Sequence, residues 1–267
     1  MMKKILTKII ILTKIKNKNE IPDYRNYSFS LAELIRFVLE ACGILGIISV
    51  LFYDSFLPFY LLIIPFLYFY LNRKQKKLCI RQKQVLENQF REMILAVSSH
   101  LQAGFSVENA FYEAYRDMNV LYGRDSLMVR EMVLMMRKLD NNEQLEQILM
   151  ELAKRSDCED IGEFAGVFMI AKRGGGDIRS IIARTATMIG DKIEVKREIE
   201  TIMSEKKLEQ NVMQCMPFFL IGYLSLTTRG FFDSLYHNLF GILLMTGCLI
   251  VYIFSVFVSE KILAIDI

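Results

Sequence analysis

Residues 238–259 read NLFGILLMTGCLIVYIFSVFVS and contain no Asp, Glu, Lys or Arg. A helix needs about 20 apolar residues to cross the hydrocarbon core of a bilayer, so this stretch predicts a membrane span. Two further uncharged stretches, Ser55–Asn72 and Gln210–Thr228, are nearly as long. A fourth, Phe37–Tyr53, is interrupted by Glu40, which an arginine one turn earlier can pair with at the interface. We therefore expect four spans, two before and two after a polar central region.

The charge distribution predicts the orientation of these spans. Lysines and arginines precede the first pair, and six more follow it before the first acid: Arg73, Lys74, Lys76, Lys77, Arg81 and Lys83. Because cytoplasmic flanks carry the excess of Lys and Arg, both flanks are expected inside, which requires a hairpin turning at Asp54–Ser55. Residues 73–210 then face the cytoplasm, the loop at Arg229–His237 lies outside, and the tail after Glu260 returns inside.

The composition fits a membrane protein that carries a polar module. Hydrophobic residues make up 53% of the chain and charged residues 24%, and the two kinds are segregated. We expect a basic amphipathic N-terminal segment and linker (1–30), a first transmembrane hairpin (31–72), a helical domain (73–210), a second hairpin (211–260) and a short cytoplasmic tail (261–267). The basic clusters adjoin the spans, so membrane lipids suffice as their partner and no nucleic acid is expected. Five scattered cysteines without a close pair predict neither a disulfide nor a zinc site.

The central segment is predicted to be an all-α bundle of six helices. Between 73 and 210 there is no proline, and apolar residues recur at spacings of three and four. The expected helices cover about 78–103, 106–122 and 125–139, then one capped by Asn141 or Asn142, one capped by Asp157 or Asp160 and ending at Gly174, and one opened by Asp177. On the first helix the residues expected to face inward are Val85, Phe90, Ile94 and Leu101. The second helix presents Val107, Ala110, Phe111 and Ala114, and the fifth contains Phe164, Val167, Phe168 and Ile170.

The last of these helices carries a heptad-like seam and is expected to run unbroken into the third span. The seam consists of Ile181, Thr185, Met188, Lys192, Val195, Ile199 and Ile202. Such a helix could transmit a displacement of the bundle to the membrane, although the same seam could also be core packing.

Several residue groups suggest chemistry, and each has a simpler structural explanation. The triplet Gly174–Gly176 lacks phosphate-loop spacing and precedes Asp177, which repels phosphate, so it predicts a turn between helices. His100 and His237 fall on opposite sides of the membrane and cannot share a site. The acids Glu151, Asp157, Glu159, Asp160 and Glu163 could hold a hard cation, and capping or solvation explains them equally well. The methionines Met128, Met132, Met135 and Met136 could form an adaptable partner surface, but core filling is favoured.

Two turns resemble a known family. LQAGFSVENAF at 101–111 resembles the L-x-A-G-[LF]-S-x-x-x-A-[LF] turn of the type II secretion F domain, and GGGDI at 174–178 is similar to its second turn. Pro217, in the membrane entry after the long helix, also resembles the family pattern. The resemblance covers about 85–267. A single copy of the domain between two hairpins looks most like the B-type platform subunit of Tad (tight adherence) pili.

The resemblance implies a non-enzymatic platform protein, with no cofactor, in the cytoplasmic membrane of a prokaryote. Its expected partners are a secretion ATPase, pilin subunits, and a related platform subunit or a second copy. The residues carried over are structural turns only: Gly104, Ser106, Gly174, Gly175, Gly176 and Asp177. Two alternatives remain, namely a membrane-anchored adaptor or signalling protein and a membrane enzyme with an unrecognised site.

Overall fold

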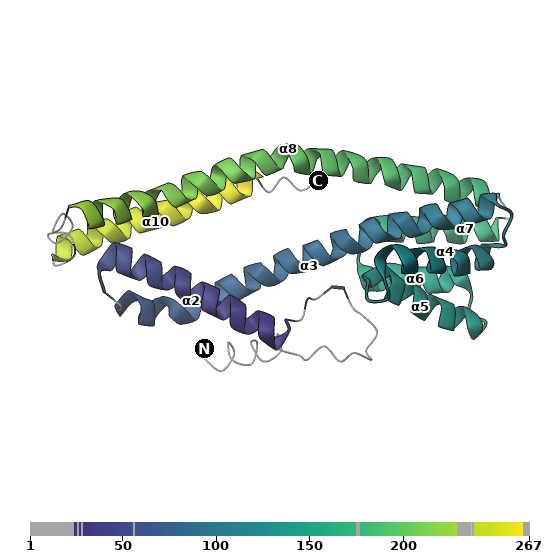
Figure 1. The fold of residues 1–267 in the computed structure, drawn as a ribbon, viewed down its shortest axis with the longest axis horizontal. Coiled ribbons are helices and arrows are strands. Elements are labelled where there is room, and N and C mark those ends of the chain that lie inside the picture. The colour runs from purple at the N-terminus through teal and green to yellow at the C-terminus, as the bar shows by residue number, and fades with distance from the viewer. Residues whose placement is uncertain are drawn as a thin grey trace. The chain divides into compact units, whose positions relative to one another are not determined.

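The computed structural model describes residues 24, 25, 27, 29–55, 57–174, 177–228, 236 and 238–263. Within these ranges the chain forms eight helices and no strand, which confirms the all-α prediction (Figure 1). The helices are α2 (Leu31–Tyr53), α3 (Leu57–Gln102), α4 (Val107–Tyr122), α5 (Leu127–Asp140), α6 (Leu145–Ser156), α7 (Glu159–Arg173), α8 (Ile178–Thr227) and α10 (Leu239–Leu263). The expected N-terminal amphipathic helix, most of the outer loop and residues 264–267 of the predicted tail lie outside the described residues, whereas residues 261–263 of that tail belong to α10.

The chain divides into two compact units. One, here called the apolar unit, contains Phe29–Arg73 and the chain from Lys196 onward. The other, here called the bundle, contains Lys74–Val195 and the described residues that precede Phe29. Both boundaries fall inside continuous helices, α3 and α8. The prediction of a separate helix beginning near residue 78 was therefore wrong, because neither proline nor glycine interrupts residues 66–102.

The bundle has one hydrophobic core, built from the second part of α3, from α4 to α7, and from the first part of α8. Its largest fully buried side chains include Phe90, Phe111, Phe164, Phe168, Leu86, Met93, Ile94, Leu101 and Met118. Phe164 contacts Phe90 edge-on, with ring centroids 5.5 Å apart, and stacks on Phe168 at 6.0 Å. Aromatic pairs of this geometry add to the free energy of area burial.

Val85 was predicted to face inward and is exposed instead, and Val167 and Ile170 of α7 are exposed as well. On α7 the buried positions are Ile161, Phe164, Ala165 and Phe168. These positions follow helical spacing, so Val167 and Ile170 occupy the opposite face. The helices of the bundle bury one side each, and an apolar residue alone does not identify that side.

The seam predicted for α8 is displaced by one residue. The buried positions are Ile182, Ala186, Ile189, Gly190 and Ile193, whereas Met188, Val195 and Ile202 are exposed. Both sets repeat at spacings of four and three, so periodicity alone favours neither. The buried set contains two small residues, and small residues let helices approach closely. A Cβ added at Gly190 would lie 3.3 Å from Arg91 Nε of α3.

Short polar residues end helices here where they were predicted to begin them. Neither Asn141 nor Asn142 is the N-cap of α6, which follows Gln144. Asn142 has φ 62° and Asp157 has φ 53°, both in the left-handed region. Asn and Asp enter this region at a lower cost than other L-residues. Asp157 therefore closes α6, and Cys158 rather than an aspartate precedes α7.

The apolar unit contains α2, α10, the first part of α3 and the last part of α8. Two helices within the described residues are long and apolar enough to cross a membrane: Leu31–Tyr53, with mean hydropathy 2.2, and Phe240–Ile262, with mean hydropathy 2.4. Only 17% and 11% of their most apolar windows are buried. A core helix of a soluble protein would have most of such a window covered, so these helices resemble membrane spans more than core helices.

Aromatic and polar contacts hold the apolar unit together. Phe52 of α2 and Tyr252 of α10 both contact Phe218 of α8 edge-on, with ring centroids 6.0 and 5.3 Å apart. The hydroxyls of Tyr53 and Thr246 lie 2.9 Å apart and join α2 to α10. The turn between α2 and α3 lies at Asp54, which has φ 43°, as the predicted hairpin turn requires.

Candidate functional site

The first predicted turn has the expected local geometry. Gly104 follows α3 with φ 96°, a conformation that L side chains rarely adopt. Ser106 precedes α4, and its Oγ accepts a hydrogen bond from the Asn109 backbone N–H at 3.4 Å. Glu108 lies in the first turn of α4, where its charge complements the helix dipole. The turn is thus explained as a helix junction, and it contains no reactive group.

The second predicted turn differs in one respect. Gly174 has φ −81° and continues the right-handed conformation of α7, so it does not supply the expected positive φ. Gly175 and Gly176 lie outside the described residues. Asp177 Oδ1 accepts hydrogen bonds from the Arg179 and Ser180 backbone N–H groups, at 3.1 and 3.4 Å, and caps α8. A carboxylate therefore occupies the position at the helix N-terminus where a phosphate would bind.

Pro217 lies in the interior of α8, within the apolar unit, and not at the start of a new helix. Its ring nitrogen carries no hydrogen, so one backbone carbonyl a turn earlier loses its helical donor. The helix nevertheless continues to Thr227. Gly222, five residues further on, lies close to Leu51 of α2, with 3.8 Å between its ideal Cβ position and Leu51 Cδ2.

The acids considered as cation ligands are instead dispersed among separate ion pairs. Asp157 Oδ2 accepts from Lys83 Nζ at 2.7 Å, Asp160 Oδ1 from Lys192 Nζ at 2.6 Å, and Glu151 pairs with Lys138. The hydrogen bond and charge of Lys83 lower the pKa of Asp157. Among the residues that the structure describes, no group of three or more His, Cys, Asp or Glu side chains is placed to hold a metal ion.

His100 and Cys158 have side chains of the kinds that serve as base and nucleophile, and both have structural roles here. His100 Nε2 lies 2.7 Å from Asp117 Oδ2, and its ring packs edge-on against Phe105. The Cys158 thiol is buried, and burial together with the charge of Glu87 raises its pKa to about 12. A thiol with this pKa stays protonated at neutral pH and is a poor nucleophile. His237 lies outside the described residues.

The four methionines of α5 are buried in the core, with exposed fractions of 0 to 7%. They fill the space between α5 and its neighbours, as the favoured interpretation expected, and form no exposed partner surface. The thioether side chain suits this role because it adapts to irregular gaps.

The most elaborate polar site is one that the sequence did not indicate. Glu131 is fully buried in α5 and receives two hydrogen bonds from Arg155 of α6, at 3.1 and 2.7 Å. The hydroxyl of Tyr24 donates a third at 2.9 Å. Burial and the negative charge of Glu131 raise the pKa of Tyr24, and the same carboxylate raises the pKa of Arg155 against the effect of burial. The site is a paired, hydrogen-bonded buried charge, which is the form in which such charges are tolerated.

Further bonds attach the residues around Tyr24 to the bundle. The Tyr24 backbone N–H donates to the Arg155 carbonyl at 3.1 Å, and Arg25 Nη2 donates to the Lys154 carbonyl at 3.0 Å. Gln75 Nε2 of α3 donates to the Tyr27 carbonyl at 2.8 Å. The sequence predicted an N-terminal segment and linker over residues 1–30. The described residues of this segment are hydrogen-bonded to α3, α5 and α6. Tyr24 and Glu131 are 107 positions apart, so no local pattern links them.

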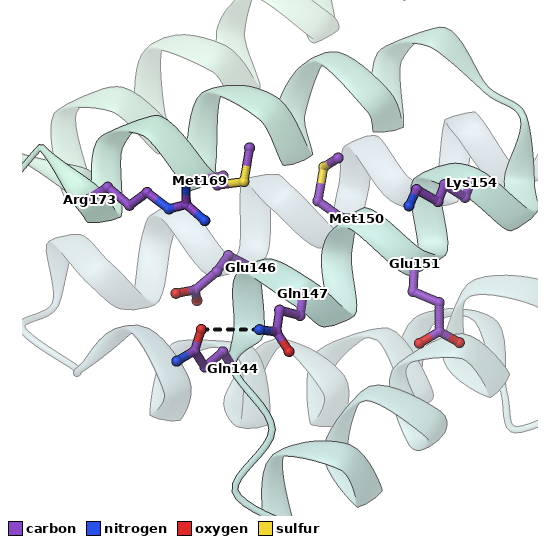
Figure 2. Close-up of a pocket in the computed structure, with 8 residues that line it drawn as sticks. All are labelled: Gln144, Glu146, Gln147, Met150, Glu151, Lys154, Met169 and Arg173. Atoms are coloured by element: carbon purple, nitrogen blue, oxygen red, sulfur yellow. Dashed lines mark hydrogen bonds between the residues drawn. The ribbon is translucent and has the colours of Figure 1, made fainter.

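A groove between α6 and α7 has a volume of about 270 Å³ (Figure 2). Met150 and Met169 contribute apolar surface, and Glu146, Glu151, Lys154 and Arg173 contribute charges of both signs. Glu146 lies 3.1 Å from Lys172 Nζ, and Glu151 pairs with Lys138. The lining includes no cysteine, histidine or serine. This groove resembles a contact surface between helices more than a reaction site.

No family model, curated protein or solved structure matches the chain.

Proposed function

We propose that this protein is a membrane platform of a type IV or Tad-like pilus or of a type II secretion machine. In this role it couples a cytoplasmic secretion ATPase to the extrusion of pilin subunits, and it performs no catalysis itself. It resides in the cytoplasmic (inner) membrane of a prokaryote as a multi-pass protein with both termini inside. It works with a related platform subunit or with a second copy of itself.

The observation that carries this proposal is the character of α3 and α8. Each is one continuous helix whose ends differ: one end belongs to the apolar unit and the other to the bundle. The exposed side chains of α8 near its C-terminus are mostly large and apolar, for example Phe219 and Leu226. Apolar surface of this extent is stable when lipid covers it. Two helices apolar enough to cross a membrane, α2 and α10, lie in the same unit as the apolar parts of α3 and α8, and this grouping supports the hairpin–bundle–hairpin plan. The left-handed Gly104 and the capping Ser106 support the first turn of the motif.

The direct test is copurification with a secretion ATPase encoded beside this chain's gene. The purified full-length protein is expected to retain that ATPase and to hydrolyse no ATP without it. Failure to retain any neighbouring ATPase, in detergent and in nanodiscs alike, would contradict the platform role.

The orientation can be tested by cysteine labelling in a background without the five native cysteines, all of which are free thiols. A membrane-impermeant maleimide added from outside is expected to label Ser234→Cys and to leave Gln82→Cys and Asn142→Cys unlabelled. Labelling of Asn142→Cys from outside would place the bundle on the wrong side for a cytoplasmic ATPase.

The coupling role of α8 can be tested by breaking the helix. A Gly-Pro insertion near Glu205 removes a helical hydrogen bond and clashes with the preceding turn. The variant is expected to insert, fold and bind the ATPase, yet to fail in pilus assembly. Normal assembly would show that this part of α8 is only a tether.

The second candidate is a membrane-anchored adaptor whose bundle binds a different cytoplasmic partner. The exposed apolar side chains Val167 and Ile170 on α7 favour some protein contact on that face. The identity of the neighbouring genes separates the two functions, since a platform is expected beside an ATPase and small pilins.

A further inference from the structure

Six cations follow the apolar start of α3, and the structure separates them into two groups. Arg73 pairs with Glu260 and lies over the Phe69 ring, Lys83 pairs with Asp157, and Lys74 is also engaged within the protein. Lys76, Lys77 and Arg81 are exposed, and no carboxylate among the described residues pairs with them. Half of the basic cluster therefore has a structural role, and the other half is available to an external partner.

The three available cations share one face of α3 with an exposed apolar side chain. Positions 76 and 80 are one turn apart, as are 77 and 81, so the four residues form a contiguous patch. Ile80, in that patch, is 58% exposed. Lys77 and Arg81 are like charges at i and i+4, an arrangement that destabilises an isolated helix. An anionic partner would remove this repulsion and cover Ile80 as well.

We propose that Lys76, Lys77, Ile80 and Arg81 form a binding face for anionic phospholipid headgroups. The inference rests on the membrane placement in the proposed function. The rise of an α-helix places Lys76 only about 6 Å, and Arg81 about 14 Å, beyond Asn72, where the uncharged stretch ends. These distances are comparable with the Debye length of about 8 Å at physiological ionic strength, so the surface potential of an anionic leaflet acts on these charges.

The chemistry of the face favours lipid over an acidic protein as the partner. Its charges begin directly after an apolar helical segment, and its apolar member is a single isoleucine, which suits the headgroup boundary of a bilayer. Each cation near an anionic surface contributes a factor of about five, and three independent contributions would multiply to about a hundredfold. Because the three cations are neighbours and share the same headgroups, their combined preference should be smaller, about tenfold or more at low salt.

The test uses the full-length protein in phosphatidylcholine vesicles that contain a small fraction of spin-labelled phosphatidylglycerol or spin-labelled phosphatidylcholine. The motionally restricted fraction of each label in electron paramagnetic resonance spectra gives the relative association of the two lipids with the protein. We expect the protein to prefer phosphatidylglycerol by about tenfold at 50 mM salt and by less at 500 mM. The variant Lys76→Gln/Lys77→Gln/Arg81→Gln is expected to lose most of this preference.

A matched control removes the same charge elsewhere. Arg124, Arg137 and Arg184 are exposed cations of the bundle, and Arg124→Gln/Arg137→Gln/Arg184→Gln should retain the full preference.

The chain contains no tryptophan, so Ile80→Trp supplies a single emitter at the face. Its emission should shift to shorter wavelength when phosphatidylglycerol is added to the vesicles, whereas millimolar inorganic phosphate should have no effect.

The possible failures can be told apart. Equal association of both labels, or a preference that survives the triple substitution, would overturn the lipid face while leaving the membrane placement intact. Absence of any restricted component, even from phosphatidylcholine, would overturn the membrane placement and the lipid face together.

Discussion

Both units consist of α-helices, but the bundle buries its large apolar side chains and the apolar unit exposes many of its own. In the bundle, large apolar residues such as Phe90 and Phe164 are buried and ion pairs occupy the outside. In the apolar unit, Phe219, Phe254 and Leu226 are more than 60% exposed. Helices with an apolar stripe on one side bury that stripe in a core and expose their polar side to water. Helices that are apolar all round, such as α10, are typical of membrane spans when most of their surface is not covered by protein.

The polar contacts differ between the units as well. The bundle contains a fully buried carboxylate, Glu131, with three hydrogen-bond donors from two distant segments. The polar contacts described in the apolar unit are mainly hydroxyls, as between Tyr53 and Thr246. A hydroxyl costs less than an ion when it leaves water.

The largest expected contrast comes from removing one phenylalanine in each unit. Phe164→Ala should destabilise the bundle by about 3 to 5 kcal/mol, because it leaves a cavity among Phe90 and Phe168. Phe254→Ala, at a 67% exposed position of α10, should change the free energy of unfolding by less than about 0.5 kcal/mol. Thermal unfolding of the full-length protein in detergent, followed by circular dichroism, measures both. A large loss from Phe254→Ala would mean that a partner or a second copy covers that side chain.

The next contrast concerns the buried charge. Arg155→Met leaves Glu131 buried with Tyr24 as its remaining donor, and removing one partner of a buried pair costs about 3 kcal/mol or more. Arg116→Met breaks an exposed i,i+3 pair with Glu113 and should cost less than about 0.5 kcal/mol. Equal costs in the same unfolding assay would show that water reaches Glu131 in the folded protein.

Glycines at a turn and in a helix provide a smaller contrast. Gly104→Ala places a side chain at φ 96° and should cost about 1 to 2 kcal/mol through backbone strain. Gly162→Ala lies inside α7 with open space at the Cβ position, so it should raise stability by about 0.5 to 1 kcal/mol. Opposite signs in the two midpoint shifts are expected. A neutral Gly104→Ala would mean that the turn relaxes without strain.

Helix type and most turn positions could be predicted from the sequence, because they depend on neighbours within a few residues. Gly104 and Ser106 illustrate this, since one φ value and one side-chain oxygen define the junction. The buried side of α8 could not be predicted, because two seams with the same spacing run along it. The residues that distinguish them, Ala186 and Gly190, matter only through the helix packed against them.

The Glu131 site was missed for a related reason. Its two donor residues, Arg155 and Tyr24, come from α6 and from the segment before α2, far from Glu131 in the sequence, so no local pattern reveals either of them. One local signal was present: Glu131 lies three residues after Met128 and four before Met135, on the methionine face of α5. A carboxylate on an otherwise apolar face indicates a buried partner, and an arginine is the side chain best suited to pair with it.

The smallest contrast between a variant and its control tests the hydrogen bond that joins Tyr24 to the bundle. Tyr24→Phe removes one hydrogen bond to a carboxylate and should cost about 1.5 kcal/mol at pH 8. Because the folded-state pKa of Tyr24 is raised above the unfolded value near 10, its contribution is fully present below pH 10 and is lost as pH rises further. The stability difference between the native protein and Tyr24→Phe should therefore narrow above pH 10.

Tyr60→Phe is the matched control, since Tyr60 is 75% exposed in α3 and the stability difference between the native protein and Tyr60→Phe should be near zero at every pH. A gap between native protein and Tyr24→Phe that stays constant to pH 11 would contradict a buried, neutral Tyr24 hydroxyl bound to Glu131.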